Sequence, residues 1–575
     1  MHPRRIGPAG RGVRPPARVR RRQGQHRQRP AQRDDPQLRR GLQRQQQREL
    51  AHPGLEGRGR RDLGGRRAPH PPVQPLRGLS RGTDKPQNDK DRIAVLTTIT
   101  VDVGTTSVKL GLFDPEGVAT VSTSQPTPTV RDADGEVYDL DAMATLIGDF
   151  IHGLDADQRA AVERVAITGV GESGGLVLPD ISLASPMILW HDQRGLPLLA
   201  GLDAMDRTRA YRTTGLPVSG NYGLSKIAWA LRAAGPAARG AQWLNIAEYI
   251  AARLTGVRWS EYSLASRTLA LDLATASWSQ DVAGLLGVHV EVLPELRRAG
   301  DGVPMRPECA RGFGLGAGVM VHVAGHDHMV GAVGAELAHG ELLNSTGTTE
   351  GLLFLRDEPS VDEHAERSKL ANGIGVTGDD FTLFASIPTG GSAFATLQSM
   401  LGVDATSLAA LCYELHAEWV AGRIDLDRVP VVLPQFRGSP SPAKNPRARG
   451  AIAGLSTDTT RAELVFGAFL GMAWQFADVL ELFRIQPDRV KVIGPASRNA
   501  LWLQLKADLL GVPLSVSSHP EVVSRGAQLL ASGETGAWAD CAPVDVPADA
   551  ARHAALTAWA DAARPVWEHL KALPA

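Results

Sequence analysis

The chain has 575 residues, of which 43% are hydrophobic and 22% are charged, and its formal net charge at pH 7 is zero. This length predicts more than one domain, each with its own core. The three cysteines lie far apart without metal-ligand spacing. This excludes a disulfide framework and indicates a reducing compartment, so we expect a cytoplasmic protein. No apolar stretch reaches membrane-spanning length, so no membrane partner is expected.

The zero net charge hides two kinds of sequence. Residues 1–90 contain 24 Lys and Arg against 7 Asp and Glu, a net charge of +17, which the remainder balances. Residues 1–94 also lack aromatic residues and apolar periodicity, so they cannot offset their ordering entropy. We expect a basic, disordered, mis-called N-terminal extension and a native start near Val95 or Leu96. A transit peptide and a basic arm for nucleic acid are the alternatives.

The first predicted strand, residues 99–101, ends in Asp102 and the turn Gly104-Thr105-Thr106, and a second strand follows at 108–113. The pair is typical of a hairpin. A Gly-Thr-Thr turn offers free N–H groups and two hydroxyls, which can surround a phosphate. A carboxylate at position 102 can hold a phosphate-bound Mg²⁺, directly or through water, or it can cap its own turn.

Strands and helices alternate along the rest of the chain, which predicts an α/β fold. Further strands are expected at 165–169, 187–190, 321–324, 342–346 and 490–493, and helices at 225–232, 244–254, 462–485 and 500–510.

The Gly-Thr-Thr turn occurs a second time, at Gly347-Thr348-Thr349, after the strand at 342–346. Two similar turns after two similar strands suggest two similar domains that hold one nucleotide between them. The chain has no G-x-x-x-x-G-K-[ST] motif, and no G-x-G-x-x-G opens a helix after a strand, so neither a P-loop nor a Rossmann site is predicted.

Asp327 follows the strand at 321–324 and lies between two histidines. A carboxylate there can accept the proton of an attacking hydroxyl during phosphoryl transfer. A metal site at His322, His326 and His328 is the competing interpretation, and it is disfavoured because carboxylate partners are missing.

Together these features resemble the FGGY family of carbohydrate kinases, near its xylulokinase and glycerol kinase branches. The resemblance covers about residues 97–535 and depends on the order of seven motifs. These are VDVGTTSVK at 101–109, ILWHDQR at 188–194, EYSLASRT at 261–268 with Trp278-Ser279, GHD at 325–327, STGTT at 345–349, RGAIAGL at 449–455 and GPASRNALWLQLKAD at 494–508.

The resemblance implies two actin-like (ribonuclease H-like) ATPase domains around a central cleft. The expected boundaries are 95–340 for a sugar-binding domain and 341–575 for a nucleotide-binding domain. The implied activity is ATP-dependent phosphorylation of a hydroxyl of a small sugar or polyol, with a pentulose such as xylulose as the acceptor class. ATP and Mg²⁺ are the expected cofactors, and a homodimer is left open.

Residue by residue, the resemblance implies that Asp327 is the general base and that Asp102 organises Mg²⁺. The expected ATP- and phosphate-binding residues are Gly104, Thr105, Thr106, Lys109, Thr346, Gly347, Thr348, Gly390, Gly391, Gly494 and Asn499. The expected substrate-binding residues are Gly171, Glu172, Trp190, Asn221 and Asp327.

Three departures from the family pattern stand out: the first, in the adenosine motif, keeps an alternative open, and the other two concern the choice of sugar and leave the kinase chemistry intact. Pro495 and Ala496 replace part of a run of glycines, residues 438–442 lack the usual Glu-Arg, and Gly171-Glu172 replaces the Met-His pair of xylulokinases. Glycerol kinases place a Glu where Glu172 lies. The alternative is a catalytically silent homologue that senses a sugar or a nucleotide.

Overall fold

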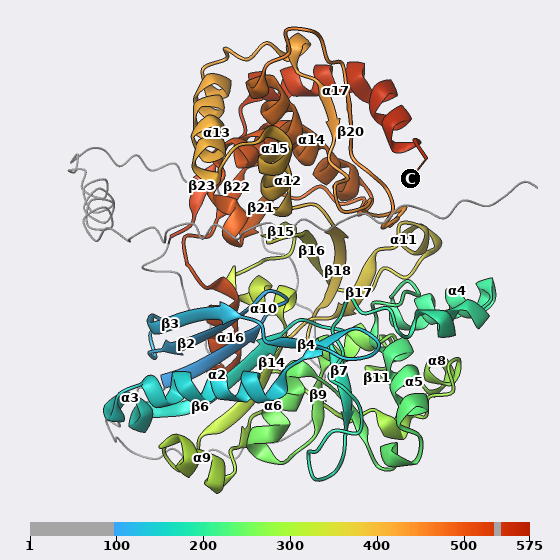
Figure 1. Cartoon of the computed structure of the whole chain (residues 1–575), viewed down its shortest axis with the longest axis vertical. Helices are drawn as coiled ribbons and strands as arrows, with labels where there is room; N and C mark the ends of the chain where they lie inside the picture. Colours follow the sequence, from blue (N-terminus) through green and yellow to red (C-terminus); the bar gives the residue numbers. More distant parts are fainter. Residues whose placement is uncertain (1–96, 534–541, 575) are drawn as a thin grey trace, which may run out of the picture. The chain divides into compact units, whose positions relative to one another are not determined.

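The computed structural model describes residues 97–533 and 542–574, and two large β-sheets organise them (Figure 1). The predicted extension at 1–94 lies outside the described residues. The first sheet has the order β13-β14-β6-β1-β2-β3. Its strands are β1 (Thr97–Val103), β2 (Ser107–Phe113), β3 (Ala119–Pro126), β6 (Val162–Gly169), β13 (Val303–Pro304) and β14 (Met320–His326).

The second sheet has the order β17-β18-β16-β15-β21-β22-β23. Its strands are β15 (Glu341–Thr346), β16 (Glu350–Arg356), β17 (Ala371–Ile374), β18 (Phe381–Ile387), β21 (Arg489–Ile493), β22 (Leu514–Val516) and β23 (Val544–Val546).

The two sheets share one strand pattern. In the first, β3-β2-β1 are joined antiparallel and β1-β6-β14 are joined parallel. In the second, β18-β16-β15 are antiparallel and β15-β21-β22 are parallel. Each Gly-Thr-Thr turn therefore joins the central strand of its sheet to the next strand of an antiparallel pair. This confirms two α/β domains with the same path, as the repeated turn predicts.

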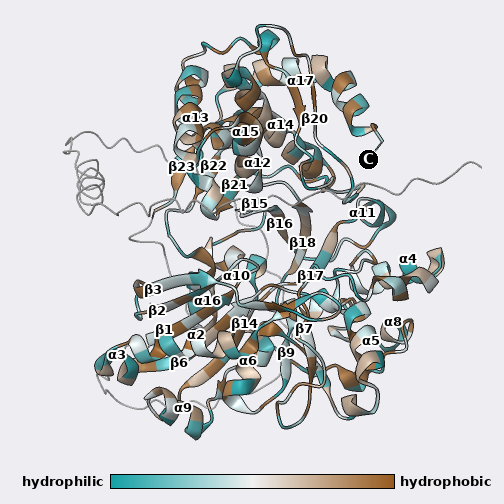
Figure 2. Cartoon of the chain, in the orientation of Figure 1, coloured by the Kyte–Doolittle hydropathy of each residue, from teal (hydrophilic) through white to brown (hydrophobic). Residues whose placement is uncertain are grey.

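Helices cover the sheets and connect their strands, and in Figure 2 they carry both hydrophilic and hydrophobic residues, as expected of helices with one buried face. They are α2 (Leu140–Gly153), α3 (Ala156–Ala161), α4 (Ala204–Thr214), α5 (Gly223–Ala234), α6 (Ile246–Thr255), α7 (Tyr262–Ala265), α8 (Gln280–Gly284), α9 (Pro307–Phe313), α10 (Asp327–Gly334), α11 (Glu363–Arg367), α12 (Ser392–Leu401), α13 (Ala405–Val420), α14 (Arg461–Glu481), α15 (Ala500–Leu510), α16 (Val522–Ser532) and α17 (Ala550–Lys571).

Five two-stranded sheets complete the described strands. They pair β4 (Thr129–Arg131) with β5 (Glu136–Tyr138), β7 (Gly174–Val177) with β8 (Gln242–Asn245), β9 (Trp259–Glu261) with β12 (Glu295–Arg297), β10 (Leu271–Asp272) with β11 (Ser277–Trp278), and β19 (Val431–Leu433) with β20 (Ala451–Ala453).

Several predicted elements differ from the structure. The helix expected at 462–485 ends earlier, at Glu481. The strand expected at 187–190 is wrong, because Ile188 makes only isolated bridges, to Val137 and Gly174. The helix expected at 244–254 begins later, at Ile246, because Asn245 ends β8 and caps α6.

Helix α14 is long and apolar enough to cross a membrane, although the sequence suggested no such segment. In the structure 78% of its apolar window is buried. Its residues Phe466, Phe469 and Trp474 are among the most buried large side chains of the protein. It is therefore packed as a core helix of the second domain.

Helices α10 and α16 cross through two glycines. A Cβ on Gly334 would lie 2.0 Å from the Val522 carbonyl oxygen, and a Cβ on Gly526 would lie 2.1 Å from the Val330 oxygen. The two backbones thus touch without intervening side chains. Helix α16 also packs on β1, β6 and β14, so a helix from the second half of the chain lies against the first sheet.

We predict that Gly526→Ala lowers the free energy of unfolding by about 1–3 kcal/mol, because the new methyl group has no space at the helix crossing. Urea unfolding measures the change. Gly153→Ala is the matched control, since this glycine also lies in a helix but a Cβ there would have no neighbouring atom within 4 Å. Equal stability of the two variants would contradict the close crossing.

Candidate active site

The first Gly-Thr-Thr turn closes the β1–β2 hairpin. Gly104 donates its N–H to Ser107 O at 3.0 Å, and a Cβ at Gly104 would lie 2.9 Å from that oxygen. The turn is therefore too tight for a side chain here. Thr105 and Thr106 are exposed at its tip, and Trp190 Nε1 donates to Thr105 Oγ1 at 3.0 Å. This geometry brings two predicted site residues, Thr105 and Trp190, into contact.

Asp102 is a buried carboxylate near the end of β1. It is 5% exposed, and its Oδ1 has no hydrogen-bond partner among the described residues. Burial raises the pKa of Asp102 to about 7, and the charges of Asp327 and Glu521 act in the same direction, while Lys109 opposes them. The site therefore concentrates negative charge in a place with little water.

Lys109 lies directly opposite Asp102 in the hairpin, and its Nζ is 2.9 Å from Glu521 Oε2. Burial lowers the pKa of Lys109, but Asp102 and Glu521 outweigh burial, so the net shift is upward. Lys109 is a predicted phosphate contact, and in this structure it pairs with the residue that precedes α16.

Asp327 is the first residue of α10, directly after β14. Its Oδ1 accepts a hydrogen bond from the His328 N–H at 2.7 Å. Burial raises the pKa of Asp327 to about 7. His328 Nδ1 lies 2.8 Å from Ser345 Oγ, so the strand before the second Gly-Thr-Thr turn contacts the residue after Asp327.

Glu172 and Arg267 form a buried ion pair. Glu172 Oε1 lies 2.8 Å from Arg267 Nε and 2.7 Å from Nη2. Arg267 Nη1 is buried without a hydrogen-bond partner among the described residues. A guanidinium has five N–H donors, so this nitrogen can donate to a hydroxyl of a bound ligand.

Gly171 and His326 lie against the same arginine. A Cβ on Gly171 would lie 2.4 Å from His326 Cδ2 and 2.9 Å from Arg267 Cγ. Burial and the charge of Arg267 lower the pKa of His326 well below its ordinary value, so its ring is neutral. Its Nδ1 is buried and has no partner in the described residues.

Arg267 and His326 are not among the predicted binding or catalytic residues, and from the sequence His326 is considered only as a ligand of the disfavoured metal site. Arg267 stands inside the EYSLASRT motif, and an arginine among small residues is a usable signal, because a buried arginine needs a carboxylate partner. No comparable signal points to Glu521, which meets Lys109 only through the fold.

The remaining residues of this motif hold the strand end that carries Asp327. Glu261 accepts hydrogen bonds from the N–H and the hydroxyl of Ser263. Ser263 Oγ in turn accepts from the His326 N–H at 2.9 Å. Gly325 has a φ of 117°, and a Cβ there would lie 2.5 Å from Ser263 Oγ. Glycine is therefore required where the chain turns toward Asp327.

Asn221 lies beside a buried lysine. Its Oδ1 accepts from Gln193 Nε2 at 2.7 Å, and its carbonyl oxygen accepts from Lys226 Nζ. Burial lowers the pKa of Lys226 to about 8, while the charge of Glu172 acts in the opposite direction. Asn221 thus contacts a lysine whose pKa also responds to the charge of Glu172.

The second turn closes the β15–β16 hairpin, where the Gly347 N–H donates to Thr349 O at 2.9 Å. Thr346 is fully buried and donates its hydroxyl to Ile493 O at 2.7 Å, whereas Thr348 is exposed. Thr346 therefore fixes the turn on the sheet, and Thr348 is the hydroxyl that a ligand can reach.

Glycines support this turn from two neighbouring loops. Gly390 and Gly391 donate their N–H groups to the oxygens of Thr348 and Gly347, at 3.1 and 2.8 Å. Gly494 has a φ of 98°, and a Cβ there would meet the backbone of the residue before the turn at 2.5 Å. Close backbone approach is thus a requirement at all three glycines.

A cavity of about 590 Å³ lies beside the second turn. Its wall includes Gly347, Thr348, Gly391 and Asn499, together with residues of α12 and α13 such as Phe394 and Tyr413. Asn499 caps α15 through its Oδ1, and its Nδ2 is buried without a partner in the described part of the chain. Four of the predicted ATP- and phosphate-binding residues therefore line one cavity, whereas Gly494 and the residues of the first turn do not.

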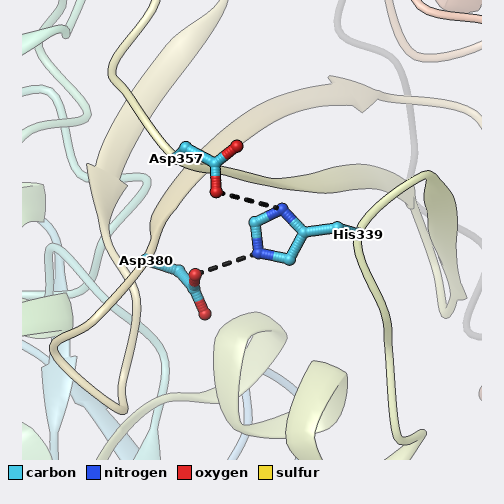
Figure 3. A group of neighbouring side chains, drawn as sticks. All are labelled: His339, Asp357 and Asp380. Carbon is cyan, nitrogen blue, oxygen red and sulfur yellow. Dashed lines mark hydrogen bonds and ion pairs between the residues drawn. The ribbon is translucent and has the colours of Figure 1, made fainter. Parts of the chain in front are cut away.

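Among the described residues, His339, Asp357 and Asp380 form the one group close enough to hold a metal ion (Figure 3). His339 Nε2 lies 2.9 Å from Asp380 Oδ1, and Nδ1 lies 3.7 Å from Asp357 Oδ1. The two carboxylates therefore face opposite nitrogens of one imidazole ring, near the protein surface.

We predict that Asp102→Asn raises the free energy of unfolding at pH 8 by roughly 1–3 kcal/mol, since it removes a buried charge that lacks partners. The folded-state pKa of about 7 exceeds the ordinary value of 3.8. The wild-type protein therefore loses this part of its stability as the pH rises from about 4 to about 7. Urea unfolding at pH 8 and pH 5 checks both points. A gain of the same size at pH 5 would contradict the assigned cause.

Two family models match nearly all of the described chain. The N-terminal domain of the FGGY family of carbohydrate kinases matches residues 97–334, and its C-terminal domain matches residues 342–533. Glycerol kinases from Gloeobacter violaceus and Allorhizobium ampelinum are 26% and 28% identical over 466 and 471 residues. These alignments cover 77% and 76% of this chain and 89% and 90% of the relatives.

Solved structures show the same fold at lower identity. Xylulose kinase from Lactobacillus acidophilus has a TM-score of 0.73 at 20% identity, over 83% of this chain and 99% of its own. Plasmodium falciparum glycerol kinase with ADP has a TM-score of 0.71 at 19% identity, over 82% and 98%. These likenesses confirm the expected two-domain, actin-like fold. With both domain models matched in order, the chain belongs to the FGGY family of carbohydrate kinases and is a carbohydrate kinase.

Proposed function

We propose that this kinase transfers the γ-phosphoryl group of ATP to a hydroxyl of a pentulose such as xylulose. Similar proteins include glycerol kinases by sequence, and xylulose and gluconate kinases by structure. The names of these proteins share the phosphorylation of a small sugar or polyol. The choice of a pentulose as the acceptor goes beyond them and belongs to the proposal.

The observation that carries the proposal is the position of Asp327. The charges of Glu172 and Arg267 act on its pKa, and so does the charge of Lys109, which lies opposite Asp102 in the first hairpin. A carboxylate with a pKa of about 7 is ionised in part at neutral pH, and it is more basic than an ordinary aspartate. Asp327 is therefore suited to accept the proton of a hydroxyl bound near Glu172 and Arg267.

The nucleotide would lie on the second domain. Its base would enter the cavity next to Asn499, whose Nδ2 offers an unused donor. Its phosphates would reach the exposed Thr348 and the N–H groups of the second turn, with the first turn facing them. The Pro495–Arg498 turn, in which Pro495 and Ala496 depart from the family pattern, borders this cavity.

Asp102 is the residue that would hold Mg²⁺. The unpartnered, buried Oδ1 fits a hard cation, and a carboxylate oxygen is the kind of ligand that Mg²⁺ prefers. Bound Mg²⁺ would supply positive charge to the phosphate oxygens. The chain itself orients the acceptor through Glu172 and Arg267 and moves its proton to an oxygen of Asp327.

We predict that Asp327→Asn lowers kcat by at least about a thousandfold while ADP affinity stays within a few-fold of wild type, because the amide cannot accept the proton. In the wild-type enzyme, kcat/KM should fall about tenfold per pH unit below pH 7, as Asp327 becomes protonated. Steady-state kinetics and calorimetric ADP binding measure the two effects. Near-normal turnover of Asp327→Asn would remove this residue from the proton transfer.

ADP formation from ATP and Mg²⁺ with a panel of acceptors tests the acceptor class. The panel contains glycerol, tetritols, pentitols, ketopentoses and ketohexoses, and we expect the highest kcat/KM with a ketopentose. A higher value with glycerol would contradict the pentulose. Nucleotide binding without turnover on any acceptor would favour the catalytically silent, sensing homologue.

A further inference from the structure

A buried charged cluster lies under the second Gly-Thr-Thr turn, outside the residues assigned above. Lys506 Nζ lies 2.7 Å from Glu350 Oε2 and 2.7 Å from Asn344 Oδ1. The two charged side chains are 0% and 1% exposed. Asn344 Nδ2 also donates to Glu350 Oε2, at 3.1 Å. The three side chains thus form one connected polar group in the core.

The cluster reaches the turn through the hairpin register. Glu350 is paired directly with Thr346 across β15 and β16, so these residues form the base of the turn. Asn344 lies two residues before Thr346 and therefore on the same face of its strand. A displacement of Glu350 would move the turn that carries Thr348.

The same lysine belongs to the helix that contributes Asn499 to the nucleotide cavity. Asn499 caps α15, and Lys506 lies two turns further along that helix. The Lys506 ammonium also lies 4.3 Å from the ring centroids of Phe476 and Trp502. The two rings hold the ammonium in one position between α15 and the β15–β16 hairpin.

An ion pair in this position is costly, since both charges leave water, and apolar residues of similar volume often serve stability equally well. Stability alone therefore gives weak grounds for a lysine here. The hydrogen bonds of Lys506 to Glu350 and Asn344 are directional. They therefore fix the distance between α15 and the β15–β16 hairpin better than apolar packing does.

We propose that Lys506 is a positioning residue that sets the spacing between the phosphate turn and the adenosine end of the nucleotide cavity. The inference depends on the proposed function, since it assumes that a nucleotide spans these two elements. A ligand that touches both ends should depend on Lys506, and a ligand that touches only the base end should not.

The test compares Lys506→Met with wild type in calorimetric binding of ADP and adenosine, and in KM for ATP and for the acceptor. We expect at least a tenfold loss of ADP affinity and a tenfold rise in KM for ATP. Adenosine affinity and acceptor KM should stay within twofold.

Arg552→Met is the matched control. Arg552 Nε pairs with the fully buried Asp508 at 2.7 Å, also on α15, but from α17 rather than from the hairpin. This variant should lose thermal stability and keep its ADP affinity. An equal loss of ADP affinity in Arg552→Met would overturn the inference, because it would make the effect one of general destabilisation.

The double variant Lys506→Met/Glu350→Leu separates position from stability even if the single variant folds poorly. With both charges gone, thermal stability should recover while the loss of ADP affinity remains. Wild-type ADP affinity in the double variant would overturn the inference. If the wild-type protein binds ADP more tightly than adenosine but phosphorylates no acceptor, the proposed function is contradicted. The comparison of Lys506→Met with Arg552→Met still tests the role of Lys506 in that case.

Discussion

Asp102 is a carboxylate that the fold removes from water while its Oδ1 has no partner among the described residues, and Asp327 is a second, partly buried carboxylate whose charge acts on it. Burial raises the pKa of each to about 7. Lys109 is the cation that acts on both, and Glu521 holds it from the second half of the chain. The unbound protein therefore holds two carboxylates with raised pKa values at the place where a cation and a proton would be received. The surrounding structure must be stable enough to hold these groups there.

Two buried ion pairs among the described residues differ from Asp102, because each charge in them faces an opposite charge. Glu172 with Arg267 and Lys506 with Glu350 have short contacts and little exposure. Pairing holds a side chain in one orientation, although a buried ion pair gives little or no net stability over apolar packing. Asp102 has no such partner for its Oδ1, which is the pattern expected where a ligand completes the bonding.

Much of the fold follows from the sequence because its signals are local. Apolar runs ending in glycine predicted β1, β6, β14 and β21, and residues 500–510 form the predicted helix without a change of bounds. The strand at 187–190 failed because an apolar run does not reveal whether a neighbour is available to pair with it. Pairing partners such as Lys109 with Glu521 were beyond prediction, since they depend on how the two sheets meet.

For the candidate site, the sequence indicated which glycines are important but not which groups they contact. The sequence indicates that Gly390, Gly391 and Gly494 matter, and the structure adds that two of them donate to the second turn while the third lies against it. The pentulose remains a prediction, because acceptor selection depends on donors such as Arg267 Nη1 and on how they are aimed.

The glycine crossing of α10 and α16 has a mechanical consequence. Helices that pack through long side chains must repack to change their crossing angle. Two helices whose backbones touch directly can rotate against each other without such repacking. Asp327 starts α10, and Glu521 immediately precedes α16. Rotation about this helix crossing would change the distance between Asp327 and Glu521 while both cores stay intact.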